Sequence, residues 1–367
     1  MNNPFNRRPV DMTTQVGSLI LQNPVLTASG TAGHGTEMAG YLDYAALGAF
    51  VTKSLAAYPW KGNPGPRLRE TPSGLLNSVG LQGPGVENWR LDELPKLRDR
   101  GATVVASIWG TTVEQFARAA QMLAGAEGVV AIEVNVSCPN LEDRSRMFAH
   151  SRSATSEAVS ASRTAGLPVW VKLSPNVADL VEIAAAGLSA GAEALVLINT
   201  LLGMSIDAPN STYRLGSGRS GGGLSGPAIR PIALRAVHDC REAFPRAASG
   251  PGGLPVSIVG VGGISSGLDA VEMMLAGADA VEVGTASFRD PRAPMKVIAQ
   301  MRKWCQGHNV HRARDLVAGV HSGKGFAESL SQVQHQEQPE HQEQSAHQEH
   351  QEHQTLRHQT VQESEQP

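Results

Sequence analysis

A repeating pattern between residues 20 and 305 restricts the folds open to this chain more than any other feature. Short apolar runs alternate with longer segments in which Ala and Leu recur at helical spacing. The runs predicted as strands are 25–29, 49–54, 103–109, 129–137, 168–174, 193–200, 255–263 and 280–287. The helical segments between them include 112–125, 153–165, 178–190, 229–243 and 266–277. Apolar strands in alternation with helices predict a parallel sheet with both faces buried.

Eight such units predict an α/β fold, a (β/α)8 TIM barrel, because their combined length is close to the usual size of about 250 residues. A doubly wound open sheet is the alternative. It normally has a glycine-rich turn that opens the first helix, and no such turn follows the first strand here. Residues 16–24, VGSLILQNP, predict an N-terminal hairpin that closes the bottom of the barrel.

Three connections are too long to be plain turns. Residues 55–87, 138–152 and 201–226 follow the second, fourth and sixth predicted strands. In a barrel these loops lie on the C-terminal face, where active sites are built. Insertions can be decoration, but these three share one face and are dense in Gly, Asn and Pro, so we interpret them as functional loops.

Charge and cysteine content exclude several classes of protein. The net charge of -3 gives no basic surface for nucleic acid. The three cysteines, Cys138, Cys240 and Cys305, include no CxxC pair, which argues against a disulfide framework, a metal site or an iron–sulfur cluster in this chain. The sequence shows neither a signal peptide nor about 18 uninterrupted apolar residues. We therefore expect a soluble, cytoplasmic protein with no membrane segment.

The C-terminal segment differs in composition from the rest. From Ser331 to Pro367 the sequence consists mostly of Gln, His and Glu, which cannot fill a core. Its histidines could bind metal, but no fixed geometry is implied, so a solvated tail is the simpler interpretation. We expect a barrel domain over residues 1–310, a transition segment over 311–330 and a disordered tail over 331–367.

Polar residues stand where the predicted strands give way to loops. They are Ser29, Lys53, Ser107, Asn135, Lys172, Asn199 and Thr200. A lysine at the end of a buried strand is costly unless it meets a negative group. Lys53 and Lys172 could form structural ion pairs with carboxylates such as Glu133. Their common position at strand ends favours a shared anionic ligand instead.

Glycine turns follow the seventh and eighth predicted strands. Gly262 and Gly263 come after the seventh, and Gly284 and Thr285 after the eighth. Each turn leads toward a helix, and we expect their backbone N–H groups to be left open at the helix N-termini for a phosphate. Barrels often build a phosphate site at this place, so the sequence predicts a phosphorylated cofactor there.

Cys138 stands apart from the other two cysteines. A buried cysteine is most often a small apolar residue, and we interpret Cys240 and Cys305 in this way. Cys138 follows a strand end, precedes a proline that stops the strand, and starts a long loop. A thiol has an ordinary pKa of about 8.5, so it is a far better base near neutral pH than a hydroxyl.

Across residues 20–305 the chain resembles the class 1 dihydroorotate dehydrogenases, flavoenzymes of de novo pyrimidine synthesis. The matching stretches, in chain order, are ASGT, VTKS, ETPSGLLNSVGLQGPG, NVSCPN, VKLSPN, INTLLGMSID, GGLSGPAI, GVGGI and VGTA. The cysteine of NVSCPN separates this class from the membrane-associated class, which uses a serine base. The form NSVGLQGPG is similar to that of the NAD-linked B type.

The resemblance implies one FMN per chain, with dihydroorotate stacked on its ring. It implies that Cys138 removes the C5 proton of dihydroorotate while a hydride passes from C6 to the flavin, giving orotate. The implied cofactor-binding residues are Ser29, Lys53, Ser54, Ser107, Asn135, Lys172, Ile198, Gly226, Gly262, Gly263, Gly284 and Thr285. The implied substrate-binding residues are Lys53, Asn77, Ser78, Val79, Gly80, Leu81, Asn135, Asn199 and Thr200. No metal ligand is implied.

The resemblance to the NAD-linked type also implies a partner. In that type a second subunit carries FAD and an iron–sulfur cluster. We therefore expect a homodimer that joins this electron-transfer subunit in a heterotetramer. Two residues depart from the family pattern: Ser107 stands where asparagine is usual, and Gly83 stands where the family reads GLQNPG.

Three alternatives remain open at this point. A related cysteine-based flavin enzyme of the same fold acts on dihydropyrimidines that lack the carboxylate of orotate. A self-sufficient homodimer linked to fumarate would use the same cysteine and much the same barrel. A non-catalytic flavin- or phosphate-binding barrel is disfavoured by Cys138.

Overall fold

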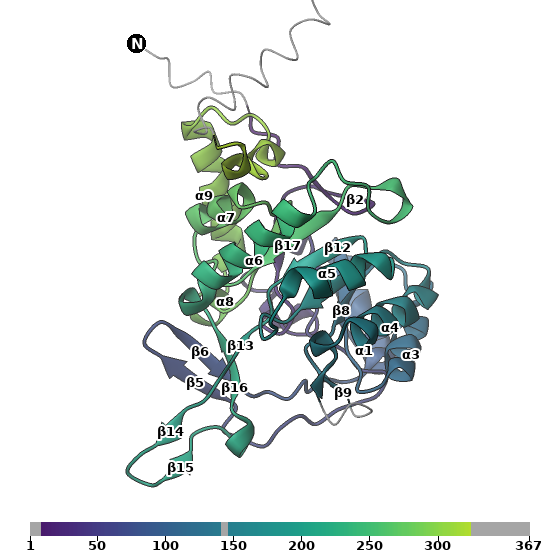
Figure 1. The fold of residues 1–367 in the computed structure, drawn as a ribbon, viewed down its shortest axis with the longest axis vertical. Coiled ribbons are helices and arrows are strands. Elements are labelled where there is room, and N and C mark those ends of the chain that lie inside the picture. Colours follow the sequence, from purple (N-terminus) through teal and green to yellow (C-terminus); the bar gives the residue numbers. More distant parts are fainter. Residues whose placement is uncertain (1–8, 141–145, 324–367) are drawn as a thin grey trace, which may run out of the picture. The chain divides into compact units, whose positions relative to one another are not determined.

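The computed structural model describes residues 9–140 and 146–323, and its main body is a barrel of eight parallel strands (Figure 1). The order around the sheet is β3-β18-β17-β12-β11-β8-β7-β4. Their bounds are β3 Val25–Thr27, β4 Phe50–Val51, β7 Val104–Ile108, β8 Val129–Asn135, β11 Val169–Leu173, β12 Ala194–Leu197, β17 Ser257–Val261 and β18 Ala280–Val283. All eight predicted strands and the (β/α)8 class are confirmed, although the strands are shorter than the apolar runs.

The barrel closes between its first two strands, β3 and β4. Leu26 and Ala49 form a parallel bridge there, and the N–H of Thr27 donates to the carbonyl of Ala49 at 3.2 Å. The hydroxyl of Thr27 accepts from the N–H of Val51 at 2.9 Å and lies 3.2 Å from the carbonyl of the same residue. The side chain of Thr27 thus extends the short hydrogen-bond ladder between β3 and β4, so the sheet closes without an open edge.

Helices follow the strands and cover the outer face of the barrel. They are α1 Val86–Asp92, α2 Leu94–Asp99, α3 Val113–Leu123, α4 Arg152–Ser162, α5 Leu180–Ser189, α6 Arg230–Ala243, α7 Gly267–Leu275, α8 Ala286–Arg289 and α9 Ala293–Gly307. In α3 the buried residues Phe116, Ala119, Ala120 and Leu123 form one stripe, as a helix packed on a sheet requires. The side chain of Thr112 caps its first turn by accepting from the N–H of Gln115.

The predicted N-terminal hairpin is confirmed and lies at the N-terminal ends of the strands. It consists of β1 (Thr14–Val16) and β2 (Leu19–Leu21). The N–H of Gly17 donates to the hydroxyl of Ser257 at 2.9 Å, and the hydroxyl of Thr14 donates to the carbonyl of Asp279 at 2.7 Å. Val16 and Leu21 also join the apolar cluster inside the barrel, so the hairpin seals its lower end.

The inside of the barrel changes from apolar to polar along the strands. Val105, Ala131, Trp170 and Ala280 belong to the buried apolar cluster. Two residues farther along the same strands, on the same face, stand Ser107, Glu133, Lys172 and Glu282. A layer of buried polar and charged side chains therefore lies directly above the apolar core, toward the C-terminal ends of the strands.

Two of the long loops contain strands that the sequence did not reveal. The bounds are β5 Leu68–Thr71, β6 Gly74–Asn77, β13 Leu201–Gly203 and β16 Gly222–Ser225. They form a separate antiparallel sheet in the order β13-β16-β6-β5, which projects from the barrel in Figure 1. Two short pairs accompany it, β9 (Pro139–Asn140) with β10 (Arg146–Met147) and β14 (Ile206–Asp207) with β15 (Thr212–Tyr213). Gly223 pairs with Asn77, so the loops after β4 and β12 support each other.

The barrel lies within a compact unit that spans Met1–Ala318, and Gly319–Pro367 form a second unit. In the second unit, the described part contains a short 3-10 turn at Gly319–Ser322. The predicted disordered tail, residues 331–367, lies outside the described residues. No helix in the described part of the chain is both long and apolar enough to cross a membrane.

A buried ion pair joins α6 to the start of β18. The guanidinium of Arg241 contacts Asp279 at 2.7 Å and donates to the carbonyls of Gly277 and Val256, each at 2.9 Å. Without Arg241, the buried Asp279 would keep only the more exposed Arg246, 3.4 Å away, as a counterion, and breaking a buried pair typically costs about 3–5 kcal/mol. We expect Arg241→Met to lower the free energy of unfolding by roughly that amount in urea titrations.

A matched control lies on the same helix. Arg235 forms a largely exposed pair with Asp239, and exposed pairs contribute about 0–1 kcal/mol. Arg235→Met should therefore leave the unfolding curve nearly unchanged. Equal small losses in the two variants would show that the Arg241–Asp279 pair is not a stabilising link.

Candidate active site

The C-terminal ends of the strands surround one cavity of about 1190 Å³. It is lined by side chains from loops that follow the barrel strands and by the separate sheet. Eighteen of the twenty residues predicted for the site line it: Ser29, Lys53, Ser54, Asn77, Ser78, Val79, Gly80, Leu81, Asn135, Lys172, Ile198, Asn199, Thr200, Gly226, Gly262, Gly263, Gly284 and Thr285. The structure thus brings together residues that lie more than 250 positions apart in the sequence.

Ser107 is one of the two predicted residues outside the cavity lining. It lies fully buried on β7, below the cavity. Its hydroxyl donates to Glu133 Oε1 at 2.8 Å and lies 2.9 Å from the hydroxyl of Ser54. The short side chain is therefore part of the buried polar layer, which explains why it does not reach the cavity.

Cys138 is the second predicted residue outside the lining. It is fully buried just beyond β8, while its neighbours Asn135 and Ser137 line the cavity. Its Sγ lies 2.9 Å from the carbonyl of Gly110 and 3.2 Å from that of Asn135, so the thiol is the donor in both contacts. Burial raises the pKa of Cys138 to about 12. The thiol is therefore protonated at neutral pH and directly adjoins the cavity wall.

Asparagine side chains form a chain of hydrogen bonds across the cavity. Asn199 donates to the amide oxygen of Asn135 at 3.2 Å, and Asn135 donates to the hydroxyl of Ser54 at 3.2 Å. Asn77, from β6, donates to the carbonyl of Gly223 at 3.1 Å. Each amide NH₂ has two hydrogens, so these residues keep donors available for a ligand. These hydrogen bonds fix the orientation of the side chains of Asn77, Asn135 and Asn199, which come from three different strand ends.

Lys172 occupies the centre of the buried polar layer and also lines the cavity. Its Nζ lies 2.7 Å from Glu282, 3.5 Å from Glu133 and 3.0 Å from the hydroxyl of Ser29. Burial lowers the pKa of Lys172, but the charges of Glu133 and Glu282 outweigh it and raise the pKa overall. The ion pair with Glu133 that the sequence suggested for Lys172 is therefore present, and Glu282 is an additional partner.

Lys53 differs from Lys172 in that none of the carboxylates in the described ranges forms an ion pair with it, although the charge of Glu37 acts on it. In the described part of the chain, its ammonium group makes no hydrogen bond or ion pair, although the side chain is partly buried at the cavity wall. Burial lowers the pKa of Lys53, and the positive charge of Arg67 lowers it further. An unpaired, partly desolvated cation in a cavity favours an anionic ligand.

The glycine turns after β17 and β18 have the backbone geometry that was expected, with one difference. Gly263 has φ +72°, and a Cβ there would meet Cβ of Arg230 at 2.5 Å, so no other residue fits. In the described chain the backbone N–H groups of Gly263, Gly284 and Thr285 donate to no backbone carbonyl. The helix after β17, however, begins only at Gly267 and is capped by Ser266 and Asp269. The open N–H groups after β17 therefore belong to the turn, and the N-terminus of α7 is satisfied by its own chain, whereas after β18 Thr285 is the N-cap of α8.

The departure at Gly83 has a structural reason. A Cβ at this position would lie 2.9 Å from Nε2 of His34, so the imidazole occupies the space that a side chain would need. His34 is partly buried, and burial lowers its pKa to about 4, so the imidazole is neutral at neutral pH. Gly83 and His34 thus fit together behind the cavity wall.

Sequence reasoning missed part of the cavity wall. Thr71, Pro72, Ser73 and Gly74, at the tip between β5 and β6, line it, as does Ser225 of β16. The hydroxyl of Ser225 lies 2.8 Å from that of Thr285, which links the small sheet to the turn after β18. A Thr-Pro-Ser-Gly turn between two short runs is a hairpin signal that could have indicated this wall.

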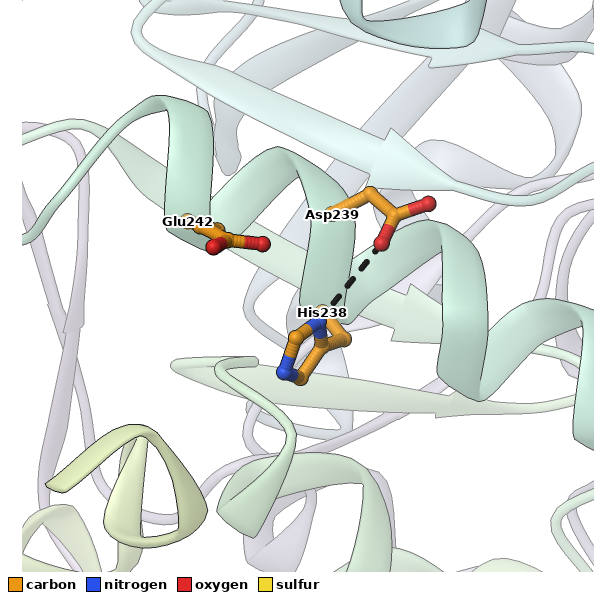
Figure 2. Close-up of side chains that lie close together, drawn as sticks. All are labelled: His238, Asp239 and Glu242. Carbon is orange, nitrogen blue, oxygen red and sulfur yellow. Dashed lines mark ion pairs between the residues drawn. The ribbon is translucent and has the colours of Figure 1, made fainter. Parts of the chain in front are cut away.

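A cluster with metal-binding residue types lies elsewhere, on α6. His238, Asp239 and Glu242 project from this helix with ligand atoms within 4.8 Å of one another (Figure 2). Nδ1 of His238 lies 3.5 Å from Asp239, and Asp239 also receives both bonds from Arg235, at 2.6 and 2.8 Å. None of these residues lines the cavity, and the arrangement is typical of charge pairs on an exposed helix face.

Comparisons with known proteins agree with this geometry. Residues 11–304 match the family model described as dihydroorotate dehydrogenase. A protein of Geobacter sp. (strain M21) is 42% identical over 315 residues, which are 86% of this chain and 99% of that protein. Its name is "Dihydroorotate dehydrogenase B (NAD(+)), catalytic subunit".

Two further relatives carry the same name. The protein of Pelobacter propionicus is 44% identical over 311 residues, covering 84% of this chain and 98% of the relative. The protein of Desulforudis audaxviator is 44% identical over 317 residues, covering 86% of this chain and 99% of the relative. The similarity therefore extends over nearly the full length of each relative.

Proposed function

The chain belongs to the dihydroorotate dehydrogenase family, and we propose that it oxidises dihydroorotate to orotate in de novo pyrimidine synthesis, with FMN as its cofactor. The observation that carries this proposal is one cavity whose lining includes Lys53, Lys172, the asparagine amides described above and the glycine turns after β17 and β18. Such a cavity offers separate places for a phosphate, a flat aromatic ring system and a small amide-bearing acid.

The residues present fit FMN. The turn at Gly262 and Gly263 excludes any Cβ and leaves backbone N–H groups for a phosphate, together with Gly284 and Thr285. Ser29, Ser54, Asn135, Ile198 and Gly226 would contact the rest of the cofactor. Lys172 would sit against the pyrimidine edge of the flavin, where negative charge develops. When bound, FMN supplies the acceptor for the hydride from C6 of dihydroorotate.

The remaining groups fit the substrate. Asn77, Asn135 and Asn199, with Thr200, would hydrogen-bond the ring amides, and residues 78–81 would present further groups from the same loop. Ser78 supports this assignment, because its buried hydroxyl lines the cavity and has no protein partner in the described chain. Lys53, which forms no ion pair with a carboxylate in the described ranges, would neutralise the carboxylate of dihydroorotate.

Cys138 is proposed as the base. It must first lose its own proton, and it then removes the C5 proton of dihydroorotate as the C6 hydride leaves. Ser137, whose buried hydroxyl also lacks a protein partner in the described part, directly precedes Cys138 and lines the cavity together with Asn135. The thiol therefore adjoins the place where the amides would hold the ring.

We further propose that electrons leave through a partner. The relatives are named catalytic subunits of an NAD-linked enzyme, which supports a second subunit that accepts the electrons. By the family resemblance this partner would hold FAD and an iron–sulfur cluster, and two copies of each chain would form a heterotetramer in the cytoplasm.

The purified chain is expected to be yellow and to release one FMN per chain on heating. It should reduce an artificial acceptor with dihydroorotate and show little or no turnover with dihydrouracil, because Lys53 would then face no carboxylate. Flavin content by absorbance and steady-state assays with both substrates measure this. Bound FMN with turnover of dihydrouracil but not dihydroorotate would instead assign the chain to the dihydropyrimidine enzymes.

A further inference from the structure

The buried polar layer contains more negative charge than its single lysine can balance. Glu133 and Glu282 are 0% exposed and Lys172 is 3% exposed. Glu133 lies on β8, next to the β11 strand of Lys172, whereas Glu282 lies on β18 and reaches Lys172 across the inside of the barrel. If both carboxylates were ionised, this cluster would carry a net negative charge away from solvent, which is costly.

The hydrogen-bond donors around the two carboxylates are also too few. Lys172 contacts Glu282 Oε2 at 2.7 Å, and the hydroxyl of Ser107 donates to Glu133 Oε1 at 2.8 Å. Glu133 Oε2, which lies 3.5 Å from Lys172 Nζ, and Glu282 Oε1 are buried, and within the described residues neither accepts a hydrogen bond. A buried carboxylate oxygen without a donor is unfavourable, and a proton on one carboxyl group would supply the missing donor.

Among the residues that the structure describes, the groups around Glu282 offer no second cation. Charged neighbours are Lys172 from β11 and Glu133 from β8, while Ser29, after β3, and Ser107, on β7, offer only hydroxyls. Burial raises the pKa of Glu282 well above its ordinary value; Lys172 offsets part of this, and the charge of Glu133 raises it further.

We propose that Glu133 and Glu282 hold one proton between them at neutral pH, so that the floor of the cavity under Lys172 is electrically neutral. Glu282 is then a positioning residue that acts through Lys172. The shared proton itself does not depend on the proposed function. Only its consequence does, namely that the charge beneath a bound flavin depends on this proton. The proton belongs to the pair, and no assignment of it to one of the two carboxylates is needed.

The proton itself is tested by infrared spectroscopy on the full-length protein as purified. The wild type is expected to show the C=O stretch of a protonated, buried carboxylic acid at pH 7, which shifts in D₂O. The band should vanish in both Glu282→Gln and Glu133→Gln, because each change leaves a single carboxylate paired with Lys172. Glu182→Gln, at an exposed pair with Arg152, is the matched control and should keep the band.

Each other outcome overturns the inference. Absence of the band in the wild type would mean that both carboxylates are ionised. Survival of the band in either glutamine variant would mean that the proton is not held jointly. Because the band requires neither FMN nor turnover, a failure here is distinct from a failure of the proposed function, which flavin content and dihydroorotate assays report.

The consequence for the cofactor is tested by the midpoint potential of bound FMN as a function of pH. At pH 7, Glu282→Gln should match the wild type, because one carboxylate charge remains beside Lys172 in either protein. At higher pH the wild-type pair loses its proton and the floor becomes negative, so its potential should fall more steeply than that of the variant. A variant potential that is more positive by the same amount at every pH would show that Glu282 is always ionised and would overturn the inference.

Discussion

Replacement of Cys138 by serine is expected to remove most oxidation of dihydroorotate near pH 7 while the FMN content stays unchanged. A positioned base contributes roughly 10²–10⁴-fold to a rate, and a hydroxyl is a much weaker base than a thiol. Rapid mixing of the oxidised protein with dihydroorotate, followed by flavin absorbance, measures the loss directly.

The flavin should be retained because Cys138 is not part of the cavity wall. Its thiol donates to the carbonyls of Gly110 and Asn135, and a serine hydroxyl can make the same contacts. Cys240→Ser, at a buried position of α6 away from the cavity, is the matched control and should react like the wild type. Unchanged flavin reduction in Cys138→Ser would remove Cys138 as the base.

The assignment of Cys138 as the base also predicts how the rate depends on pH. Burial raises the pKa of Cys138 to about 12, and the base must be the thiolate. Below this pKa the thiolate fraction grows with pH, so kcat/KM of the wild type should rise across the range from pH 7 to 10. The serine variant should recover part of its activity only at the alkaline end.

The barrel and most of its mouth could be predicted because both follow from local patterns. A buried parallel strand is apolar throughout, so a lysine or asparagine at its last position, such as Lys172 or Asn135, is visible without a structure. The carboxyl ends of all barrel strands meet on one face, and this alone places such residues together.

Glu282 could not be predicted in this way. In the run AVEV it is indistinguishable from an outward-facing residue of an alternating strand. Its role depends on reaching Lys172 across the barrel, because β11 and β18 are not neighbours in the sheet. Only barrel closure, which relies on the Thr27 contacts between β3 and β4, fixes that juxtaposition.

The separate sheet was hidden for a different reason. Its strands have three or four residues and are rich in glycine, as in β16, GGLS. Strand propensity over so few residues is weak, and the pairing of Gly223 with Asn77 joins segments 146 positions apart. The sequence therefore indicated functional loops there, whereas the structure has a second sheet that supports the cavity.

Formation of NADH by the isolated chain is expected to be negligible, and addition of the partner subunit should restore it. Cys240 lies on α6, Cys305 on α9 and Cys138 just beyond β8, and among the described residues no group with metal-binding side chains includes a cysteine, so they do not form an iron–sulfur site. No glycine-rich dinucleotide turn follows the first strand either. Dihydroorotate should still reduce an artificial acceptor at full rate with the isolated chain.

The decisive comparison uses fumarate and NAD as acceptors for the lone protein under anaerobic conditions. A self-sufficient enzyme would reduce fumarate rapidly, because fumarate is a small dicarboxylate that could enter the cavity beside Lys53 once orotate leaves. The NAD-linked assignment instead expects slow fumarate turnover and no NADH until the partner is added, since electrons must leave through a second subunit. Fast fumarate reduction without a partner would contradict the NAD-linked assignment, yet the chemistry at Cys138 would stand, because both types oxidise dihydroorotate with the same base.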